Sequence, residues 1–319
     1  MKKRILALAL SVFLAFSLTA CGSSSKETTA TQSSQSTSED AIKIAYLPIT
    51  HALALFEEAE ELKNNTGLNV ELVKYGSWPE LLDALNSGHV DGASVLVELA
   101  MKSVEEGIGI KAVALGHKDG NVIVASNDIK SAADLKGKTF AIPHRQSSHN
   151  ILLNDELASA GLTVDDVKVT ELAPTEMPSA LASGQIDAYC VAEPFGAKAV
   201  ALGVGHVLNY SEDLWKDSLC CTLVLTDNFI NSNKEKATQF VEAYKTAGKN
   251  LTTDKAKEVA KEYLGQDEKV LDLSLQWISY DDLDITKDIY DSLVEKVKKY
   301  GLSDNPPAYD KFVENLTQE

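Results

Sequence analysis

An internal repeat constrains the fold of this chain more than any other feature of its sequence. Residues 84–91 (ALNSGHVD) recur as residues 180–187 (ALASGQID), at an offset of 96. Upstream, the strand-to-proline segment 43–48 corresponds to 138–143 at an offset of 95. Landmarks that keep one order and a nearly constant offset indicate two similar lobes. The alternative is that any two βα units look alike at this level of detail.

Apolar runs rich in β-branched residues alternate with helical patterns from residue 42 onward. Residues 42–47 and 70–74 are typical of strands, residues 51–65 of a helix, and a capping box at Ser77 begins the next helix. This alternation predicts βαβ units and an α/β fold with largely parallel sheets. Ligands of such sheets bind beyond the carboxyl ends of the strands, so the two strand-to-proline turns should face a shared crevice.

The turn that follows residue 143 holds the richest polar cluster of the chain. It contains Arg145, the only arginine beyond residue 4, together with Ser147, Ser148 and His149. A helix N-terminus with serine hydroxyls and a guanidinium is a ready site for an anion. The plainer alternative is that a serine caps the helix and Arg145 pairs with a surface acid.

Five further residues are candidates for lining the crevice. Thr50 and His51 follow the first strand, where His51 could donate to an oxyanion or either residue could cap a helix. Trp78 could form an aromatic wall or pack in the core, and Ser94 lies just past the first repeat. Glu193 could accept from a ligand's amino group or orient Arg145, and its place at a helix start also suits the macrodipole.

The cysteines do not match a known metal or redox motif. Cys190, Cys220 and Cys221 are expected to be buried thiols, because a bridge between adjacent cysteines is strained. A metal site would have to gather these thiols with histidines from separate loops, namely His51, His144 and His149. Since no CxxC or HExxH spacing supports it, we expect no metal and no cofactor. No nucleophile elbow or phosphate loop is present in the sequence, so we do not expect an enzyme.

The N-terminal segment predicts export and anchoring. Residues 1–20 are typical of a signal peptide with a basic start and a short apolar run. They end in Leu-Thr-Ala before Cys21, which resembles a bacterial lipobox and predicts lipidation of Cys21. A plain secretory signal is the alternative. Residues 21–41 are rich in Ser, Thr and Gln and should form a flexible tether to the extracellular face of the cell membrane.

The charge balance excludes nucleic acid as a partner. The chain has 47 acidic and 30 basic residues, a net charge of −17. Nucleic-acid binding needs a basic surface, which this composition does not supply. A small anion is not excluded, because a binding site depends on local donors rather than on the total charge.

Four segments of the chain form a recognisable set: residues 44–51 (IAYLPITH), 91–93 (DGA), 142–150 (IPHRQSSHN) and 187–195 (DAYCVAEPF). Together they resemble the substrate-binding lipoproteins of ABC importers in the nitrate, sulfonate, taurine and bicarbonate group, whose wider relatives bind a thiamine pyrimidine precursor. Nitrate and bicarbonate receptors of this group tend to have Trp where this chain has Phe195, which argues against those two cargoes.

The resemblance implies a two-lobed, periplasmic-binding-protein-like fold of type II, in which two α/β lobes flank a ligand cleft and a two-strand hinge joins them. Residues 42–125 and 223–319 would form lobe 1, and residues 126–222 would form lobe 2. The apolar segments 121–126 and 222–226 are the expected crossings between the lobes.

The function implied by the resemblance is that of a monomeric receptor that captures a small anion, such as a sulfonate, taurine or nitrate, and delivers it to an ABC permease and its ATPase. Arg145, Ser147 and Ser148 would hold the charged end of the cargo. Thr50, His51, Trp78 and Ser94 would contribute from the opposite wall. A thiamine pyrimidine precursor or similar heterocycle is the alternative cargo, with Glu193 as its partner. A zinc receptor and an enzyme are less favoured.

Overall fold

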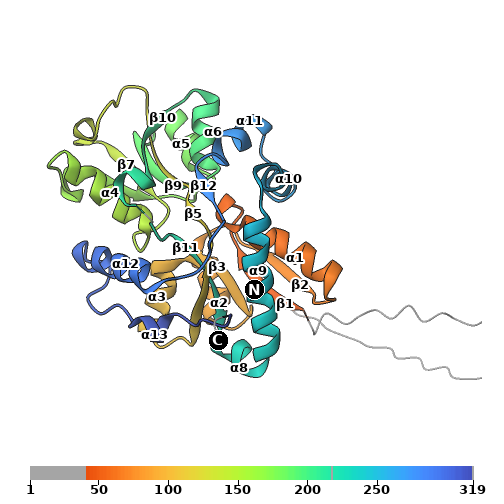
Figure 1. The fold of residues 1–319 in the computed structure, drawn as a ribbon. Helices are drawn as coiled ribbons and strands as arrows, with labels where there is room; N and C mark the ends of the chain where they lie inside the picture. Colours follow the sequence, from red (N-terminus) through yellow and green to blue (C-terminus); the bar gives the residue numbers. More distant parts are fainter. Residues whose placement is uncertain (1–40, 217, 318–319) are drawn as a thin grey trace, which may run out of the picture. The chain divides into compact units, whose positions relative to one another are not determined.

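The computed structural model describes residues 41–216 and 218–317 (Figure 1). The expected signal peptide, Cys21 and the tether up to residue 40 lie outside the described residues. Within the described part of the chain, no helix has both the length and the apolar character needed to cross a membrane.

The first of the two large sheets has five strands in the order β2-β1-β3-β11-β4. Strands β1 (Ile42–Tyr46), β2 (Val70–Lys74) and β3 (Gly92–Leu96) are parallel to one another. Strand β11 (Cys221–Thr226) runs antiparallel between β3 and β4 (Ile110–Leu115). Figure 1 shows this late strand among strands from the N-terminal part of the chain.

The second sheet repeats this arrangement, with the order β10-β6-β9-β7-β8. Strands β7 (Thr139–Ile142), β8 (Lys168–Glu171) and β9 (Ala188–Ala192) are parallel. Strand β6 (Asn121–Ala125) runs antiparallel between β9 and β10 (His206–Tyr210). All five residues of the central strands β3, β6 and β9 are buried, as expected for strands that helices cover on both faces.

Matching hydrogen bonds confirm the internal repeat. The Asp91 carboxylate accepts from the backbone N–H of Lys43, and the Asp187 carboxylate accepts from that of Thr139, both at 2.8 Å. The structural counterpart of Lys43 is therefore Thr139, at the same offset of 96 as the two aspartates. The sequence alignment of Lys43 with Lys138 was wrong by one residue, because it matched two prolines of which Pro48 is the second residue after β1 and Pro143 the first after β7.

The crossings between the two sheets differ from those expected. The segments 121–126 and 222–226 do not span the gap, because β6 lies inside the second sheet and β11 inside the first. Their buried backbone groups are paired in these sheets, as buried N–H and C=O groups require. The chain instead crosses between β4 and β6 and returns between β10 and β11. The division into lobes at residues 125 and 222 remains a prediction, and β6 belongs with the second sheet.

Helices surround both sheets. The helices between β1 and β11 are α1 (Leu53–Asn65), α2 (Trp78–Asn86), α3 (Val97–Glu105), α4 (Ser148–Ser159), α5 (Met177–Ala182), α6 (Phe195–Leu202) and α7 (Ser211–Leu214). The C-terminal helices are α8 (Asp227–Ser232), α9 (Lys234–Asn250), α10 (Thr253–Leu264), α11 (Glu268–Ser274), α12 (Lys287–Lys299) and α13 (Tyr309–Phe312). Helix α9 packs on α1, whereas α11 packs on α6 beside the second sheet.

Short elements complete the crossing region. The 3-10 helix η2 (Thr50–Ala52) joins β1 to α1. Strand β5 (Lys118–Asp119) lies in the first crossing and pairs with β12 (Ile278–Ser279), so that a C-terminal segment braces it. Two further 3-10 helices lie beside the second sheet, η3 (Ala132–Leu135) and η4 (Val164–Asp166).

Candidate functional site

Buried histidines and cysteines gather where the chain crosses between the two sheets. His51 comes from η2, His117 from the first crossing, and Cys220 and Cys221 from the end of the second crossing and the start of β11. One ligand atom from each of these four residues lies within 4.8 Å of the others. All four side chains are buried. We call these four residues the crossing cluster.

A glycine allows the elements that carry the cluster to approach closely. The backbone N–H of Gly116 donates to the carbonyl of Cys221 at 2.8 Å. A Cβ at position 116 would lie 3.1 Å from both the Cys221 Cβ and the His51 carbonyl oxygen. Contacts this short are rare for real Cβ atoms, so a glycine at this position lets η2, β4 and β11 meet.

The backbone determines the orientation of the His51 ring. Its Nε2 lies 3.0 Å from the Gly120 carbonyl oxygen, which can only accept, so Nε2 carries the proton. Its Nδ1 lies 3.4 Å from the Cys221 Sγ and 3.8 Å from the Cys220 Sγ. The imidazole therefore presents a nitrogen lone pair to the two sulfur atoms.

His117 stacks on His51, with ring centroids 3.4 Å apart and an interplanar angle of 28°. Neither ring nitrogen of His117 has a hydrogen-bond partner within the described residues. Burial, together with the proximity of His51, lowers the pKa of His117 to about 4. His117 is thus a neutral imidazole at physiological pH.

The two adjacent cysteines are free thiols, as the sequence predicted, with their Sγ atoms 3.9 Å apart. Burial alone would raise the pKa of Cys220, but the Cys221 thiol, His149 and neighbouring imidazoles outweigh it and lower this pKa well below its usual value. Burial, and then the contact with Cys220, raise the pKa of Cys221 well above its usual value. The Cys220 thiol therefore loses its proton more readily than the Cys221 thiol.

Further buried polar groups surround the cluster. The Asn121 side-chain oxygen lies 3.7 Å from the Cys220 Sγ. The Ser148 hydroxyl at the start of α4 donates to the Glu98 carboxylate at 3.5 Å, and burial raises the pKa of Glu98 well above its usual value. His149 is fully buried, and neither of its ring nitrogens has a partner in the described chain. Burial lowers the pKa of His149 to about 4, while the charge of Cys220 opposes this shift.

Thr50 and Glu193 contact each other across the two sheets. The Thr50 hydroxyl and backbone N–H both donate to the Glu193 carbonyl oxygen at 2.9 Å. The Glu193 carboxylate accepts from the backbone N–H of Ala197 at 3.1 and 3.2 Å, at the start of α6. Burial raises the pKa of Glu193 to about 8. These contacts fit a structural role for both residues.

The structure does not bring Arg145 to the cluster. Its side chain is exposed, and its guanidinium donates to the Val169 carbonyl oxygen at 3.2 Å, beside β8. Its neighbour Ser147 is buried and caps α4, because its hydroxyl oxygen accepts from the backbone N–H of Asn150 at 3.3 Å. The structure therefore agrees with the plainer alternative for Ser147 and gives Arg145 a surface position.

The two remaining candidates are buried beside other elements. Trp78 lies at the first position of α2, and its Nε1 has no partner among the residues described. Ser94 lies in the middle of β3, opposite Leu223 of β11. Within the described residues, no side-chain hydrogen bond or ring contact joins either residue to the crossing cluster.

Sequence reasoning missed His117, Glu98 and Asn121 as members of one site with the cysteines. His117 follows β4 and Cys220 precedes β11, and the two are neighbours only because these strands pair. The signal that the sequence offered was a histidine and two cysteines, each at the end of an apolar strand.

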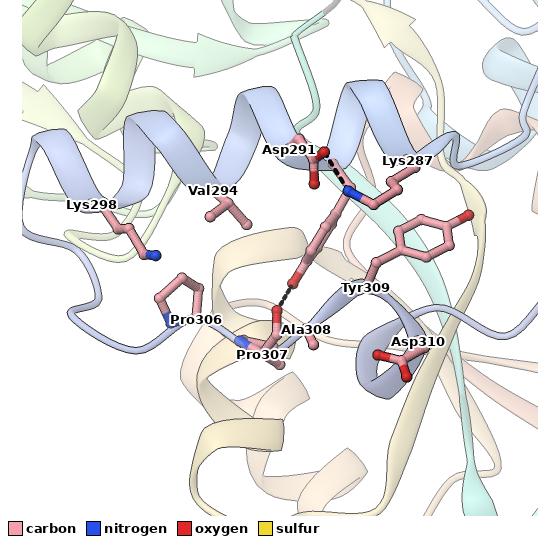
Figure 2. A pocket seen from close by; sticks show the side chains of 10 residues that line it. Lys287, Asp291, Val294, Lys298, Pro306, Pro307, Ala308, Tyr309 and Asp310 are labelled. Atoms are coloured by element: carbon pink, nitrogen blue, oxygen red, sulfur yellow. Dashed lines mark hydrogen bonds and ion pairs between the residues drawn. The ribbon is translucent and has the colours of Figure 1, made fainter.

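A hollow between α12 and the C-terminal segment is a poorer candidate (Figure 2). Lys287 and Asp291, which line it, form an ion pair with each other at 2.5 Å, and both side chains are exposed. The Tyr290 hydroxyl there donates to the Pro307 carbonyl oxygen at 2.6 Å. These polar groups already have partners, unlike those around the crossing cluster.

The two sheets of matching topology define a periplasmic-binding-protein-like fold. Residues 35–265 match the model of the NMT1-like family, and the chain belongs to this family. Its resemblance to the nitrate, sulfonate and bicarbonate group and its periplasmic-binding-protein-like fold are both confirmed.

Individual relatives support this assignment. The zinc-bound ligand-binding component of an ABC-type import system from Staphylococcus aureus is 40% identical, with a TM-score of 0.83, covering 87% of this chain and 97% of that one. The periplasmic aliphatic sulphonate binding protein SsuA from Escherichia coli shares the fold, with 20% identity, a TM-score of 0.73 and coverage of 88% and 94%.

A curated relative is the nitrate/nitrite binding protein NrtA from Nostoc sp., which is 24% identical over 220 residues, covering 61% of this chain and 50% of that protein. The chain spans between 30% and 57% of the length of the curated relatives that it matches.

Proposed function

We propose that this chain is the extracytoplasmic solute-binding component of an ABC importer. It captures a small solute between its two lobes and delivers it to a permease driven by an ATPase. The proposal is supported by the family, by the fold and by the similarity to the import-system component from S. aureus. The predicted lipid anchor at Cys21 and the monomeric state are part of the same proposal.

One observation carries this proposal. Buried polar groups from α3, α4, β6 and the first crossing lie around Cys220 and have no hydrogen-bond partners among the described residues: Glu98 Oε1, both ring nitrogens of His117 and His149, and Asn121 Nδ2. Each buried polar group left unpaired costs about 1–3 kcal/mol. A solute that pairs with these groups recovers this free energy, which makes the crossing region the favoured binding site.

The position of the cluster fits closure of the lobes on a solute. The unpaired groups come from elements of both lobes and flank the crossings. The crossings are the segments about which two such lobes hinge. A solute bound there would hold the lobes together, and the closed form would be the one that the permease recognises.

Two cargo classes follow from the relatives. Their names favour an anion such as nitrate or a sulfonate, and the N-terminus of α4 with Ser148 offers backbone donors to such a group. The zinc in the S. aureus structure adds a divalent metal ion to the cargoes to be tested. Glu193, the expected partner of a heterocycle, already accepts from Ala197.

Thermal unfolding of the purified protein against a ligand panel tests the proposal. The panel contains alkanesulfonates, taurine, nitrate, bicarbonate, an aminopyrimidine, and zinc added after chelation. A cargo at about 100 times its Kd should raise the free energy of unfolding by about 2.7 kcal/mol. Uptake of the stabilising solute should then be lost in cells that lack the chain and restored by complementation. Unchanged uptake of every stabilising solute would contradict the importer role.

A further inference from the structure

We propose that the crossing cluster binds a thiophilic divalent metal ion of the zinc class, with His51, His117, Cys220 and Cys221 as its four ligands. The inference deepens the proposed function and rests on it for the ion's role as cargo. It also replaces the sequence-based expectation that the chain has no metal site.

The distances within the cluster match those of a tetrahedral site. With Zn–S bonds of about 2.3 Å and Zn–N bonds of about 2.0–2.1 Å, tetrahedral geometry gives about 3.6 Å between N and S ligands and about 3.8 Å between two sulfur atoms. The His51 Nδ1 lies 3.4 and 3.8 Å from the two Sγ atoms, which are 3.9 Å apart. The His51 nitrogen and the two sulfur atoms are therefore already at the spacing that a bound ion requires, and a His117 ring nitrogen lies within 4.8 Å of them.

The protonation of His51 also fits a metal ligand. Metal-binding histidines almost always donate their second N–H to a carbonyl or carboxylate, which orients the ring. The Nε2 of His51 makes this bond to the Gly120 carbonyl, leaving the Nδ1 lone pair directed at the sulfur atoms. No hydrogen-bond partner in the described chain competes for the ring nitrogens of His117.

The charge of the site favours a cation over an anion. A divalent ion bound by two thiolates and two neutral imidazoles is neutral overall, as a fully buried site demands. Binding forms two metal–sulfur and two metal–nitrogen bonds, and the protons still on the thiols leave to solvent. An anion at the same place would face the sulfur atoms of Cys220 and Cys221, and the described contacts of the four ligands include no lysine or arginine.

The ligands also link the first lobe to both crossings. His117 lies in the first crossing and Cys220 in the second, whereas His51 lies beside the first sheet. Asn121 of the second sheet lies against Cys220. Binding of one ion would tie both crossings to the first lobe.

Metal titration of the chelator-treated, reduced protein tests the site. Zinc is titrated against a chromophoric chelator, and cobalt is used as the spectroscopic probe. We expect one ion per chain, with a cobalt spectrum that shows thiolate charge-transfer bands and tetrahedral ligand-field intensity. Cys221→Ser and His117→Gln should each weaken zinc binding by more than about 100-fold, because even loss of an outer-shell partner costs about 10–100-fold.

Cys190→Ser is the matched control. Cys190 is a free, buried thiol in β9 that does not belong to the crossing cluster. This variant should bind zinc with the affinity of the parent. The unfolding midpoint of each metal-free variant is measured first, and His117→Gln carries the test if Cys221→Ser does not fold.

The outcomes separate this inference from the proposed function. Absence of zinc binding by the folded parent, equal affinity in both ligand variants, or an octahedral cobalt spectrum would overturn the metal site. If a sulfonate stabilises the protein and zinc does not, the importer proposal stands and this inference fails. If zinc binds at the cluster but zinc uptake by cells does not depend on the chain, the cargo role is overturned.

Discussion

The two sheets share one backbone plan but carry different side chains at equivalent positions. Cys221 opens the antiparallel strand of the first sheet and pairs with Leu96. Asn121 opens the antiparallel strand of the second sheet and pairs with Ala192, which is the counterpart of Leu96 at the offset of 96. A thiol on one side therefore corresponds to an amide on the other.

The same contrast appears one residue further along. The backbone N–H of Val97 donates to the Cys220 carbonyl at 2.8 Å, and that of Glu193 donates to the Gly120 carbonyl at 3.0 Å. The hydrogen bonds are equivalent, yet an apolar side chain in the first lobe is replaced by a buried acid in the second. Main-chain geometry is thus common to the two lobes, whereas the chemistry of the site comes from substitutions on that common frame.

The largest effect that tests this contrast is the pH dependence of the free energy of unfolding that Glu193 causes. Its pKa is about 8 in the folded protein against 4.5 as the ordinary value, so folding retains a proton between these pH values. Stability from this group is therefore greatest below about pH 4.5, falls as the pH rises, and levels off above about pH 8. The fall should be about 4–5 kcal/mol. Urea unfolding between pH 5 and 9 measures it.

Glu193→Gln keeps an acceptor for Ala197 without the charge and serves as the comparison. The difference in free energy of unfolding between variant and parent should move in favour of the variant as the pH rises. A difference that does not change with pH would show that Glu193 does not retain this proton.

Gly92→Ala should break the first sheet selectively. A Cβ at position 92 would lie 2.4 Å from the Val224 carbonyl oxygen and 2.7 Å from the Leu225 Cδ2. We expect a loss of about 3 kcal/mol, at the upper end for overpacking. The counterpart in the second sheet is already alanine, and Ala188→Gly should cost only about 1 kcal/mol. Similar losses for both variants, measured by urea unfolding, would contradict this difference between the lobes.

Asp91→Ala and Asp187→Ala should have equal, smaller effects. Each carboxylate accepts from a backbone N–H of the neighbouring strand at 2.8 Å. Loss of such a bond should cost about 1–2 kcal/mol in either lobe. The ion pair of Asp187 with Lys138 at 3.6 Å adds little, because both side chains are partly exposed. Chemical denaturation of the two variants side by side checks whether the repeat is also energetically symmetric.

Arg145→Ala should have the smallest effect. The side chain is exposed and donates to one carbonyl oxygen beside β8. We expect a change in stability within about 0.5 kcal/mol, as for other surface positions. Solute affinity should stay within about twofold by the ligand-panel titration. Loss of anion binding in this variant would instead restore the sequence-based role of Arg145.

The sequence predicted the two-lobed α/β architecture because the repeat and the alternation of apolar patterns are local signals. It also predicted the buried thiols and a helix N-terminus capped by a serine in the turn after residue 143. The positions predicted for the two crossings were wrong. An apolar segment indicates a buried strand, but it does not show which sheet the strand joins.

The candidate site was predicted only in part for a related reason. His51, Ser148 and His149 were singled out from their turns, and the structure places them in or near the site. His117 and the cysteines meet through the pairing of β4 with β11, which are separated by more than 100 residues in the sequence. No local pattern records that pairing. Arg145 has a side chain that suits anion binding, but the backbone of one turn decides where that side chain points.

The position of β11, a strand from late in the chain, inside the first sheet has a consequence for folding. The edge of β3 stays without its neighbour until residues 221–226 have been synthesised, so the first lobe cannot be completed while the chain is still being made. Pairings this distant in sequence slow folding and leave strand edges open to aggregation. A fragment that ends at residue 216 should therefore expose the edge of β3 and aggregate.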